Sequence, residues 1–342
     1  MTDRGIAVTT RRTAEVEGAA VDPQALAAAG VPVILRGAVR DWPLVRAGMD
    51  APHAALARLA TLDDGHQVTR YVAPAEAHGR FFYNEALTGF NFTAERVSLA
   101  RHLADVEAEA ASPAPRALYV GSTDIDQFLP RLRGENDLHA DFGGGDPTVS
   151  IWIGNRTVAA THYDASDNLA CCVLGRRRFT LFPPDQAANL YPGPLAPTPG
   201  GQVVSMVDPA APDLGRHPRF AAALAAAQVA ELEPGDVLFY PALWWHQVEA
   251  LDDANVMINY WWSRSAPWSD PPMAALLHAM LSLRDRPAAE KASWRALFDH
   301  YVFGDPRATC DHLPPHARGA LAPLDEVGAR RLRAEIAERL NR

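Results

Sequence analysis

Between about residues 117 and 265 the chain consists mainly of short runs of β-branched and aromatic residues, separated by Gly, Pro and Asp. Residues 149–153 (VSIWI), 168–174 (NLACCVL) and 237–241 (VLFYP) are typical of these runs. Many short strands divided by turn residues are characteristic of an antiparallel barrel or a double-sheet jelly roll. We therefore predict a mainly β core of this kind over residues 117–265.

Helical patterns flank this core on its N-terminal side. Asp22, followed by Pro23 and an Ala-rich run that stops at Gly30, has the N-cap, first-turn proline and C-terminal glycine of a short helix. Residues 99–111 carry the clearest helical periodicity before the core. We expect residues 1–116 to form a helix-rich flank that packs on the barrel.

Helical patterns also follow the core, in residues 266–342. They cover residues 272–283, 288–303 and 324–340. The last pattern has one apolar stripe in which every fourth residue takes part: Leu324, Gly328, Leu332, Ile336 and Leu340. The stripe has two alternative roles, packing on its own barrel or pairing with a second subunit. We expect a C-terminal helical region that is a candidate surface for a homodimer.

Composition limits the function classes that remain. The 342 residues are 48% hydrophobic, which is ample for a globular core, and the formal net charge of −9 argues against a nucleic-acid binder. Three cysteines without a CxxC pair suggest neither a disulfide scaffold nor a zinc knuckle. The first twelve residues lack an apolar segment, and no run approaches the length of a membrane span. We expect a soluble cytoplasmic protein with no membrane partner.

A candidate metal site lies within the β core. His162 and Asp164 flank Tyr163 in a strand-like context, and His246 follows in the run LWWHQV. Residues i and i+2 of a strand point to the same face, so His162 and Asp164 can bind one ion. Two histidines and one carboxylate form the facial ligand set of non-haem Fe(II) oxygenases. The alternative is two unrelated histidines near an acid, in a chain with 12 histidines.

A second H-x-D motif, at His139 and Asp141, competes with the first. It lies in a polar stretch that runs into three consecutive glycines at 143–145. Such a composition is typical of a surface loop, whereas the motif at His162 lies between two strand-like runs. A rigid element positions ligands better than a loop does, so we predict that His162 and Asp164 bind the metal.

Strand alternation also separates three neighbouring arginines. In the run RRRFTLF, Arg177 shares a face with Phe179 and Leu181, whereas Arg176 and Arg178 face the other way. Arg177 should therefore point into the core, where a guanidinium is costly unless it meets an anion. Two alternatives remain open: the anion is the carboxylate of a ligand, or it is a protein Asp or Glu in a buried ion pair.

Two amide side chains are predicted to be buried by the same argument. Asn259 shares a face with Met257 and Trp261, and Asn168 shares one with Ala170. A buried amide requires hydrogen-bond partners, which a ligand or a metal-bound group could supply. Bridging neighbouring strands would satisfy the same requirement, so both roles remain open.

From Trp152 to Ser263 the sequence resembles the cupin-like branch of the JmjC oxygenases, and in particular its bacterial members. That family includes the asparaginyl hydroxylase that inhibits hypoxia-inducible factor. Residues 31–43 (VPVILRGAVRDWP) also resemble the family's entry segment. The matching motifs within the core are His162-Tyr163-Asp164, Asn168, the run GRRRFTLFPP from Gly175, Leu190-Tyr191-Pro192, the run PGDVL from Pro234, Trp244-Trp245-His246 and Asn259-Tyr260-Trp261.

The resemblance implies a double-stranded β-helix that binds Fe(II) through His162, Asp164 and His246, with 2-oxoglutarate as co-substrate. The family's lysine for the distal carboxylate falls on Arg177, and a tyrosine that helps to hold this carboxylate matches Tyr119. The family's threonine three residues before the first histidine is Ala159 here, and Thr161 is a candidate substitute. The residues expected to contact or wall the co-substrate are thus Tyr119, Thr161, Asn168, Arg177, Asn259 and Trp261.

Three functions follow in order of preference. The first is an Fe(II)- and 2-oxoglutarate-dependent hydroxylase of a peptide, a protein side chain or a small molecule. The second is a cupin-fold metal-binding or sensory protein without turnover. The third is a demethylase, since an acidic surface could attract basic tails, although no reader module accompanies the barrel.

Overall fold

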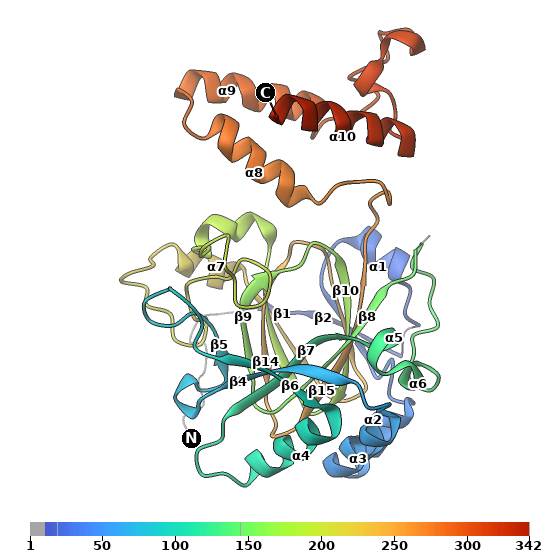
Figure 1. Cartoon of the computed structure of the whole chain (residues 1–342), viewed down its shortest axis with the longest axis vertical. Helices are drawn as coiled ribbons and strands as arrows, with labels where there is room; N and C mark the ends of the chain where they lie inside the picture. Colours follow the sequence, from blue (N-terminus) through green and yellow to red (C-terminus); the bar gives the residue numbers. More distant parts are fainter. Residues whose placement is uncertain (1–10, 19, 144, 342) are drawn as a thin grey trace. The chain divides into compact units, whose positions relative to one another are not determined.

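The chain divides into two compact units in the computed structural model, which describes residues 11–18, 20–143 and 145–341 (Figure 1). The first unit ends at Ser263 and the second begins at Arg264. The boundary expected at residue 116 lies inside the first unit, because the segment before it supplies strands to both sheets of the core.

One of the two sheets has six strands, in the order β1-β12-β11-β14-β9-β5. Its four central strands pair in antiparallel fashion, whereas β1 and β5 pair with β12 and β9 in parallel at the two edges. The strands are β1 (Arg11–Arg12), β5 (Arg80–Phe81), β9 (Val158–Tyr163), β11 (Arg177–Phe182), β12 (Gln228–Leu232) and β14 (Trp245–Ala250).

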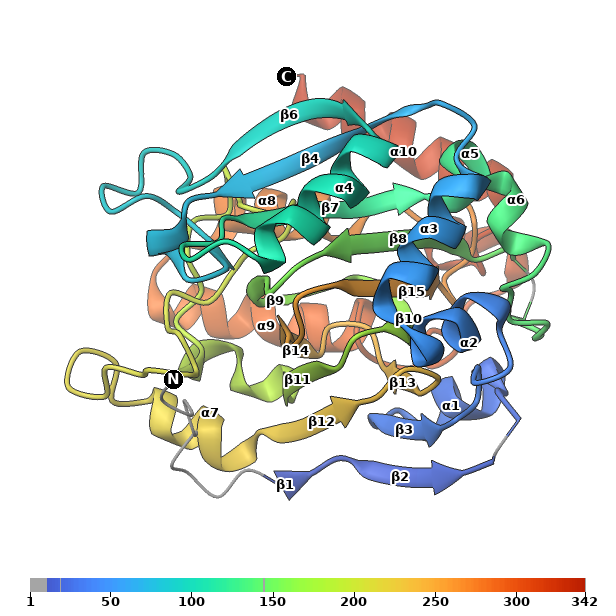
Figure 2. The ribbon, with the colours of Figure 1, turned by 90° about the horizontal axis from the view of Figure 1, so that it is seen from below.

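The other sheet has nine strands, in the order β2-β3-β13-β10-β15-β8-β7-β4-β6, which Figure 2 shows in succession. Only the β2–β3 pair of this sheet is parallel. The strands are β2 (Ala14–Glu17), β3 (Val33–Arg36), β4 (Gln67–Ala73), β6 (Thr93–Ser98), β7 (Ala117–Asp124), β8 (Thr148–Gly154), β10 (Asp167–Leu174), β13 (Val237–Tyr240) and β15 (Asn255–Trp262).

Strands β8 to β15 form the double-stranded β-helix that the sequence predicted. β8, β10, β13 and β15 lie in the larger sheet, and β9, β11, β12 and β14 lie in the smaller one, so that successive strands mostly alternate between the sheets. The inner faces meet in an apolar cluster that includes Phe179, Leu181, Leu238 and Met257. Alternation along each strand places one face in this cluster and the other face outside it.

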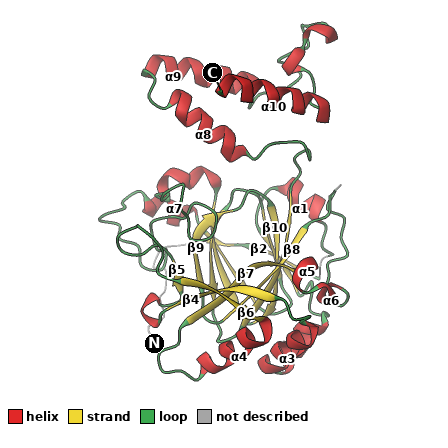
Figure 3. Ribbon diagram, in the orientation of Figure 1, coloured by secondary structure: helices red, strands yellow, loops and turns green. Residues whose placement is uncertain are grey.

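Helices pack on the nine-stranded sheet and at one end of the six-stranded sheet (Figure 3). α2 (Pro43–Asp50), α3 (Pro52–Leu62) and α4 (Leu99–Ala110) pack on the nine-stranded sheet, with buried side chains such as Leu59 and Leu103. α7 (Phe220–Ala226) packs its Phe220 against Phe182 of β11. Full burial of one such side chain stabilises the fold by about 1.5–3 kcal/mol. β10 lies between the covering helices and the barrel interior, so its side chains are buried on both faces. The short helices α5 (Ile125–Phe128) and α6 (Pro130–Arg133) follow β7.

The segment before residue 117 is less helical than the sequence predicted. The helix expected after Asp22 is present as α1 (Pro23–Ala29), with the Asp22 carboxylate accepting from two backbone amides and Gly30 in the left-handed conformation. However, residues 67–98 contain β4, β5 and β6. Tertiary pairing with β7 and β9 decides their conformation, and this pairing cannot be read from local periodicity.

A glycine turn fixes the start of β11. Gly175 has φ +69°, and a Cβ at this position would lie 2.4 Å from the Ala254 carbonyl oxygen. Glycine is therefore required for the chain to turn from β10 into β11. The turn places Arg177 at the first position of β11, with its side chain inside the barrel.

The second unit is helical throughout its regular structure. It contains α8 (Pro272–Leu283), α9 (Ala288–Tyr301) and α10 (Glu326–Leu340), none of which has a buried residue. In the predicted apolar stripe, Leu324 lies just before α10, and it is 43–56% exposed together with Ile336 and Leu340 of the helix. No helix among the described residues is both long enough and apolar enough to cross a membrane.

We expect the full-length protein to be a homodimer that buries the apolar stripe of α10, because an exposed stripe of this kind gains stability when a partner covers it. Light scattering should give twice the monomer mass. Ile336→Asp should shift the mass towards that of the monomer, whereas Ala334→Asp, which adds the same charge to another face of α10, should not. A monomer mass at every protein concentration would contradict the prediction.

Candidate metal centre

Two histidines and one aspartate meet at the inner face of the six-stranded sheet. His162 near the end of β9 lies opposite His246 of β14 in the strand register, and Asp164 follows directly after β9. One ligand atom from each of these residues lies within 4.8 Å of the others. Within the described residues, no other group of three or more His, Cys, Asp or Glu side chains could share a metal ion.

Backbone carbonyls fix both imidazole rings. The Nδ1 atoms of His162 and His246 lie 2.8 Å and 3.0 Å from the carbonyl oxygens of Ala160 and Trp244. A carbonyl can only accept, so each Nδ1 carries the proton and each Nε2 has a free lone pair for a metal. Burial and the neighbouring His162 lower the pKa of His246 to about 4, so His246 is neutral near pH 7.

The donor set fits a divalent transition metal. Asp164 Oδ2 lies 3.6 Å from His246 Nε2, and the two imidazole rings have centroids 4.3 Å apart. Two nitrogens and one carboxylate oxygen on one side of an ion leave its other coordination positions open. All three side chains line one cavity, so a bound ion would have its open positions there.

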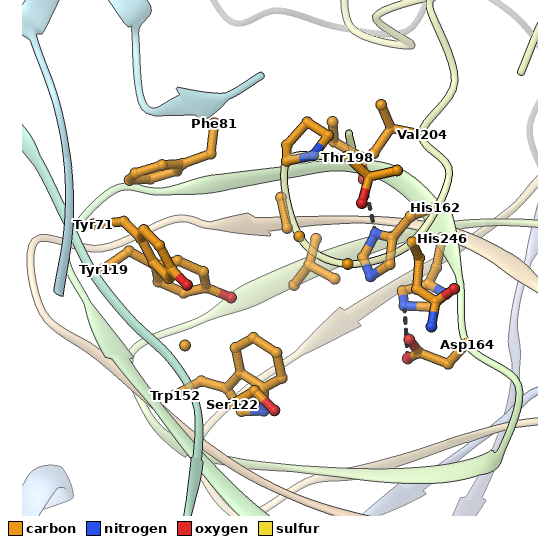
Figure 4. Close-up of a pocket in the computed structure, with 18 of the residues that line it drawn as sticks. Tyr71, Phe81, Tyr119, Ser122, Trp152, His162, Asp164, Thr198, Val204 and His246 are labelled. Carbon is orange, nitrogen blue, oxygen red and sulfur yellow. Dashed lines mark hydrogen bonds and ion pairs between the residues drawn. The ribbon is translucent and has the colours of Figure 1, made fainter. Parts of the chain in front are cut away.

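The cavity has a volume of about 450 Å³, which is in the range of small-molecule sites. Figure 4 shows Tyr71, Phe81 and Tyr119 on one side of it and the three ligands on the other. Most of the lining is aromatic or aliphatic: Tyr71, Phe81, Phe90, Phe92, Ala94, Tyr119, Trp152, Ala159, Ala160, Pro199, Val204, Tyr240, Val248, Met257 and Trp261. The metal centre thus opens into a space of low polarity.

A family model described as a cupin-like domain matches residues 19–267. The chain belongs to the cupin-like domain family. The resemblance that the sequence motifs indicated is therefore confirmed at the level of the family.

This cupin-like chain is similar to longer proteins. It is 34% identical to lysine-specific demethylase JMJ31 of Arabidopsis thaliana over 116 residues, 34% of this chain and 21% of that protein. It is 40% identical to HSPB1-associated protein 1 of Homo sapiens over 148 residues, 40% of this chain and 30% of that protein. It is 34% identical to tRNA wybutosine-synthesizing protein 5 of Danio rerio over 145 residues, 40% of this chain and 39% of that protein. The matches thus span less than half of each relative.

The cupin-like barrel buries Arg177 without a counter-charge. Its side chain is 2% exposed, and its Nε and Nη2 atoms have no hydrogen-bond partner. Burial lowers the pKa of Arg177, and the groups that oppose this effect are Tyr119 and Cys172 rather than a carboxylate. The ion pair with a protein Asp or Glu that the sequence left open is therefore not formed by the described residues.

The arginines on either side of Arg177 face outward, as alternation predicted. Arg176 pairs with Asp252 at 2.8 Å, and Arg178 pairs with Glu231 at 2.7 Å. Both pairs are partly exposed, so they are of little importance for stability. The outward-facing Arg176 and Arg178 thus each have an acidic partner, whereas the inward-facing Arg177 has none among the described residues.

Two buried amides connect the cavity wall to the metal ligands. Asn168 Nδ2 lies 3.4 Å from Asp164 Oδ2, and Asn259 Nδ2 lies 3.5 Å from Asn168 Oδ1. The indole Nε1 of Trp152 donates to Asn259 Oδ1. The amides therefore bridge β8, β10 and β15, and the chain of contacts ends at the carboxylate. A contact of this kind orients a ligand, and its loss typically lowers metal affinity by about 10–100-fold.

The predicted co-substrate residues differ in their access to the cavity. Tyr119, Asn259 and Trp261 line it, whereas Asn168 and Arg177 lie behind its lining. Burial raises the pKa of Tyr119, and the positive charge of Arg177 opposes that rise. The arginine charge therefore acts on the cavity at the position of Tyr119.

Thr161 faces away from the cavity, and its buried Oγ1 has no hydrogen-bond partner. An irregularity in the pairing of β9 with β14 lies between the His246–His162 and Val248–Ala159 pairs. As a result, both Ala159 and Ala160 line the cavity. Thr161 directly precedes the inward-facing His162 in β9, so strand alternation alone turns it to the opposite side of the sheet. The structure gives no support to Thr161 as a substitute for the family's threonine.

Several cavity residues were missed by sequence reasoning. Tyr240 shares its strand face with Leu238, so alternation could have placed it inside the barrel. Four further cavity residues come from the flank that was expected to be helix-rich, and no local pattern indicated their position: Tyr71, Phe81, Phe90 and Phe92. The turn at residues 198–202 also lines the cavity.

Proposed function

We propose that this cupin-like protein is an Fe(II)- and 2-oxoglutarate-dependent oxygenase that hydroxylates a peptide, a protein side chain or a small molecule. The observation that carries the proposal is the unpaired, buried Arg177 beside a cavity that opens onto a two-histidine, one-carboxylate centre. An unpaired buried charge destabilises a protein, so its presence favours a ligand that supplies the opposite charge.

The residues present fit both absent groups. His162, Asp164 and His246 would hold Fe(II) with positions left open towards the cavity. Bound Fe(II) would couple the oxidative decarboxylation of 2-oxoglutarate by dioxygen to the insertion of one oxygen atom into a substrate C–H bond. Arg177 would neutralise the distal carboxylate of the co-substrate, with the Tyr119 hydroxyl as a second donor.

The chain's own side chains would perform three tasks. The carbonyls of Ala160 and Trp244 fix the histidine tautomers, and Asn168 orients the Asp164 carboxylate. The aromatic and aliphatic lining holds water away from the centre and strengthens the Arg177–carboxylate attraction. A substrate group that enters the cavity would then be held beside the metal, and this positioning lowers the barrier of the reaction.

Anaerobic addition of Fe(II) and 2-oxoglutarate tests the proposal without turnover. We expect a weak visible charge-transfer band, because a keto acid chelates iron only where two coordination positions are open. Iron alone should not give the band, and succinate, which lacks the keto group, should not replace 2-oxoglutarate. Metal binding without the band would instead support a cupin-fold metal-binding or sensory protein.

A further inference from the structure

Four aromatic side chains form one continuous wall of the cavity, called the aromatic wall below: Tyr71 of β4, Phe81 of β5, and Phe90 and Phe92 of the following loop. Phe92 is at its centre. Its ring centroid lies 5.1 Å from Phe90, 5.3 Å from Phe81 and 5.5 Å from Tyr71. These are the separations of favourable aromatic pairs.

The aromatic wall faces the metal ligands across the cavity, as Tyr71 and Phe81 show in Figure 4. No Lys or Arg lines the cavity, and its one carboxylate is the ligand Asp164. Arg177 behind the lining would already be paired with the co-substrate, so an anionic substrate group would meet no further counter-charge in the lining. A cationic group would have to compete with the metal for Asp164. Burial of a charged group without a partner is energetically costly in such surroundings, whereas burial of an uncharged apolar ring is favourable.

We propose that the substrate of this oxygenase presents an uncharged aromatic ring, which packs on the aromatic wall and thereby lies between the wall and the metal. The inference rests on the proposed function, because it assigns the wall to the substrate rather than to the co-substrate. The ring gains edge-to-face and stacked contacts in addition to its burial. A methylated ammonium group is the alternative occupant of an aromatic cavity, but it would bring its positive charge next to that of the bound metal ion.

The amide N-acetyl-4-fluorophenylalaninamide is a suitable probe, observed by fluorine NMR with the full-length protein, 2-oxoglutarate and either Mn(II) or Zn(II). Paramagnetic Mn(II) broadens the signal only of a ring that binds near the metal. We expect marked broadening with Mn(II) and little with Zn(II). The N-acetyl amide of trimethyllysine should displace the probe poorly, and its tighter binding would overturn the proposal in favour of a methylated-lysine substrate.

Matched leucine variants separate the wall from the rest of the segment. Phe90→Leu and Phe92→Leu keep an apolar side chain but remove a ring, and each should weaken probe binding by about twofold to tenfold. Phe82→Leu is the control: Phe82 does not line the cavity and instead packs beneath the Arg80 guanidinium at 3.7 Å. Equal affinity in all four proteins would overturn the proposal, and Phe90, which is partly exposed, remains informative if Phe92→Leu does not fold.

Binding of 2-oxoglutarate distinguishes a wrong substrate assignment from a wrong proposed function. If the protein binds 2-oxoglutarate by calorimetry but the probe is not broadened, the substrate assignment is wrong and the oxygenase stands. If the probe binds near the metal but 2-oxoglutarate does not bind, the wall is a ring site of a protein that is not an oxygenase of this type, which overturns the inference as stated.

Discussion

Replacement of Arg177 by Ala is expected to lower the affinity for 2-oxoglutarate by a hundredfold or more. The distal carboxylate would then lie in an apolar pocket without a counter-charge, and breaking a buried pair in this way costs about 3–5 kcal/mol. Iron affinity should change little, because Arg177 is not a ligand. Arg177→Lys should restore part of the affinity, since it returns the charge without the planar fork. Calorimetric titration of 2-oxoglutarate into the Mn(II)-loaded variants measures the effect.

The free energy of unfolding of the ligand-free protein is an independent test of the role of Arg177. Arg177 has no counter-charge there, so Arg177→Met should leave the free energy of unfolding unchanged or raise it. Loss of an arginine that forms a structural ion pair would instead lower the free energy of unfolding.

The neighbouring arginines are the controls for co-substrate binding. Arg176→Ala and Arg178→Ala, which remove surface pairs with Asp252 and Glu231, should leave co-substrate affinity nearly unchanged. Wild-type affinity in Arg177→Ala would contradict the assignment.

Loss of any metal ligand is the second large effect. His162→Ala, Asp164→Ala and His246→Ala should each reduce Fe(II) affinity by more than about a hundredfold, since residues that only orient ligands already contribute about 10–100-fold. Asn168→Ala, which removes the contact to Asp164, should have that smaller effect. Anaerobic metal titration of each variant checks the order of these losses.

The second H-x-D motif supplies the control for these variants. His139 and Asp141 are exposed, and Asp141 accepts hydrogen bonds from Gln24 and Gly143 in a segment without regular structure. His139→Ala and Asp141→Ala should therefore retain wild-type iron affinity. Retained affinity in His246→Ala together with a loss in His139→Ala would reverse the assignment of the metal centre.

Strand alternation was the most productive source of sequence prediction. It placed Arg177 inside the barrel with Phe179 and Leu181, and it placed Asn168 and Asn259 among buried side chains, as the structure has them. A side-chain period of two is a local property of an extended chain, so it can be read without knowledge of the fold. The choice between the two H-x-D motifs rested on the same local context.

Local rules failed where the strand partner determined the outcome. Ala159 and Ala160 are neighbours in β9 and should face opposite ways, but the irregular pairing of β9 with β14 brings both of them to the cavity. Residues 67–98 were expected to belong to a helix-rich flank, but they contain strands that pair with β7 and β9 and bring the aromatic wall to face the metal ligands. Register irregularities and edge pairings depend on distant segments, and short-range periodicity does not contain them.

The sequence by itself therefore determined the β-helix core, the three metal ligands as candidates and the inward direction of Arg177. Only the tertiary structure decided that Arg177 has no acidic partner and that an uncharged aromatic surface faces the metal ligands. The physical reason is that burial and direction of one side chain follow from its own strand. The identity of its neighbours instead follows from how strands distant in sequence pair and pack.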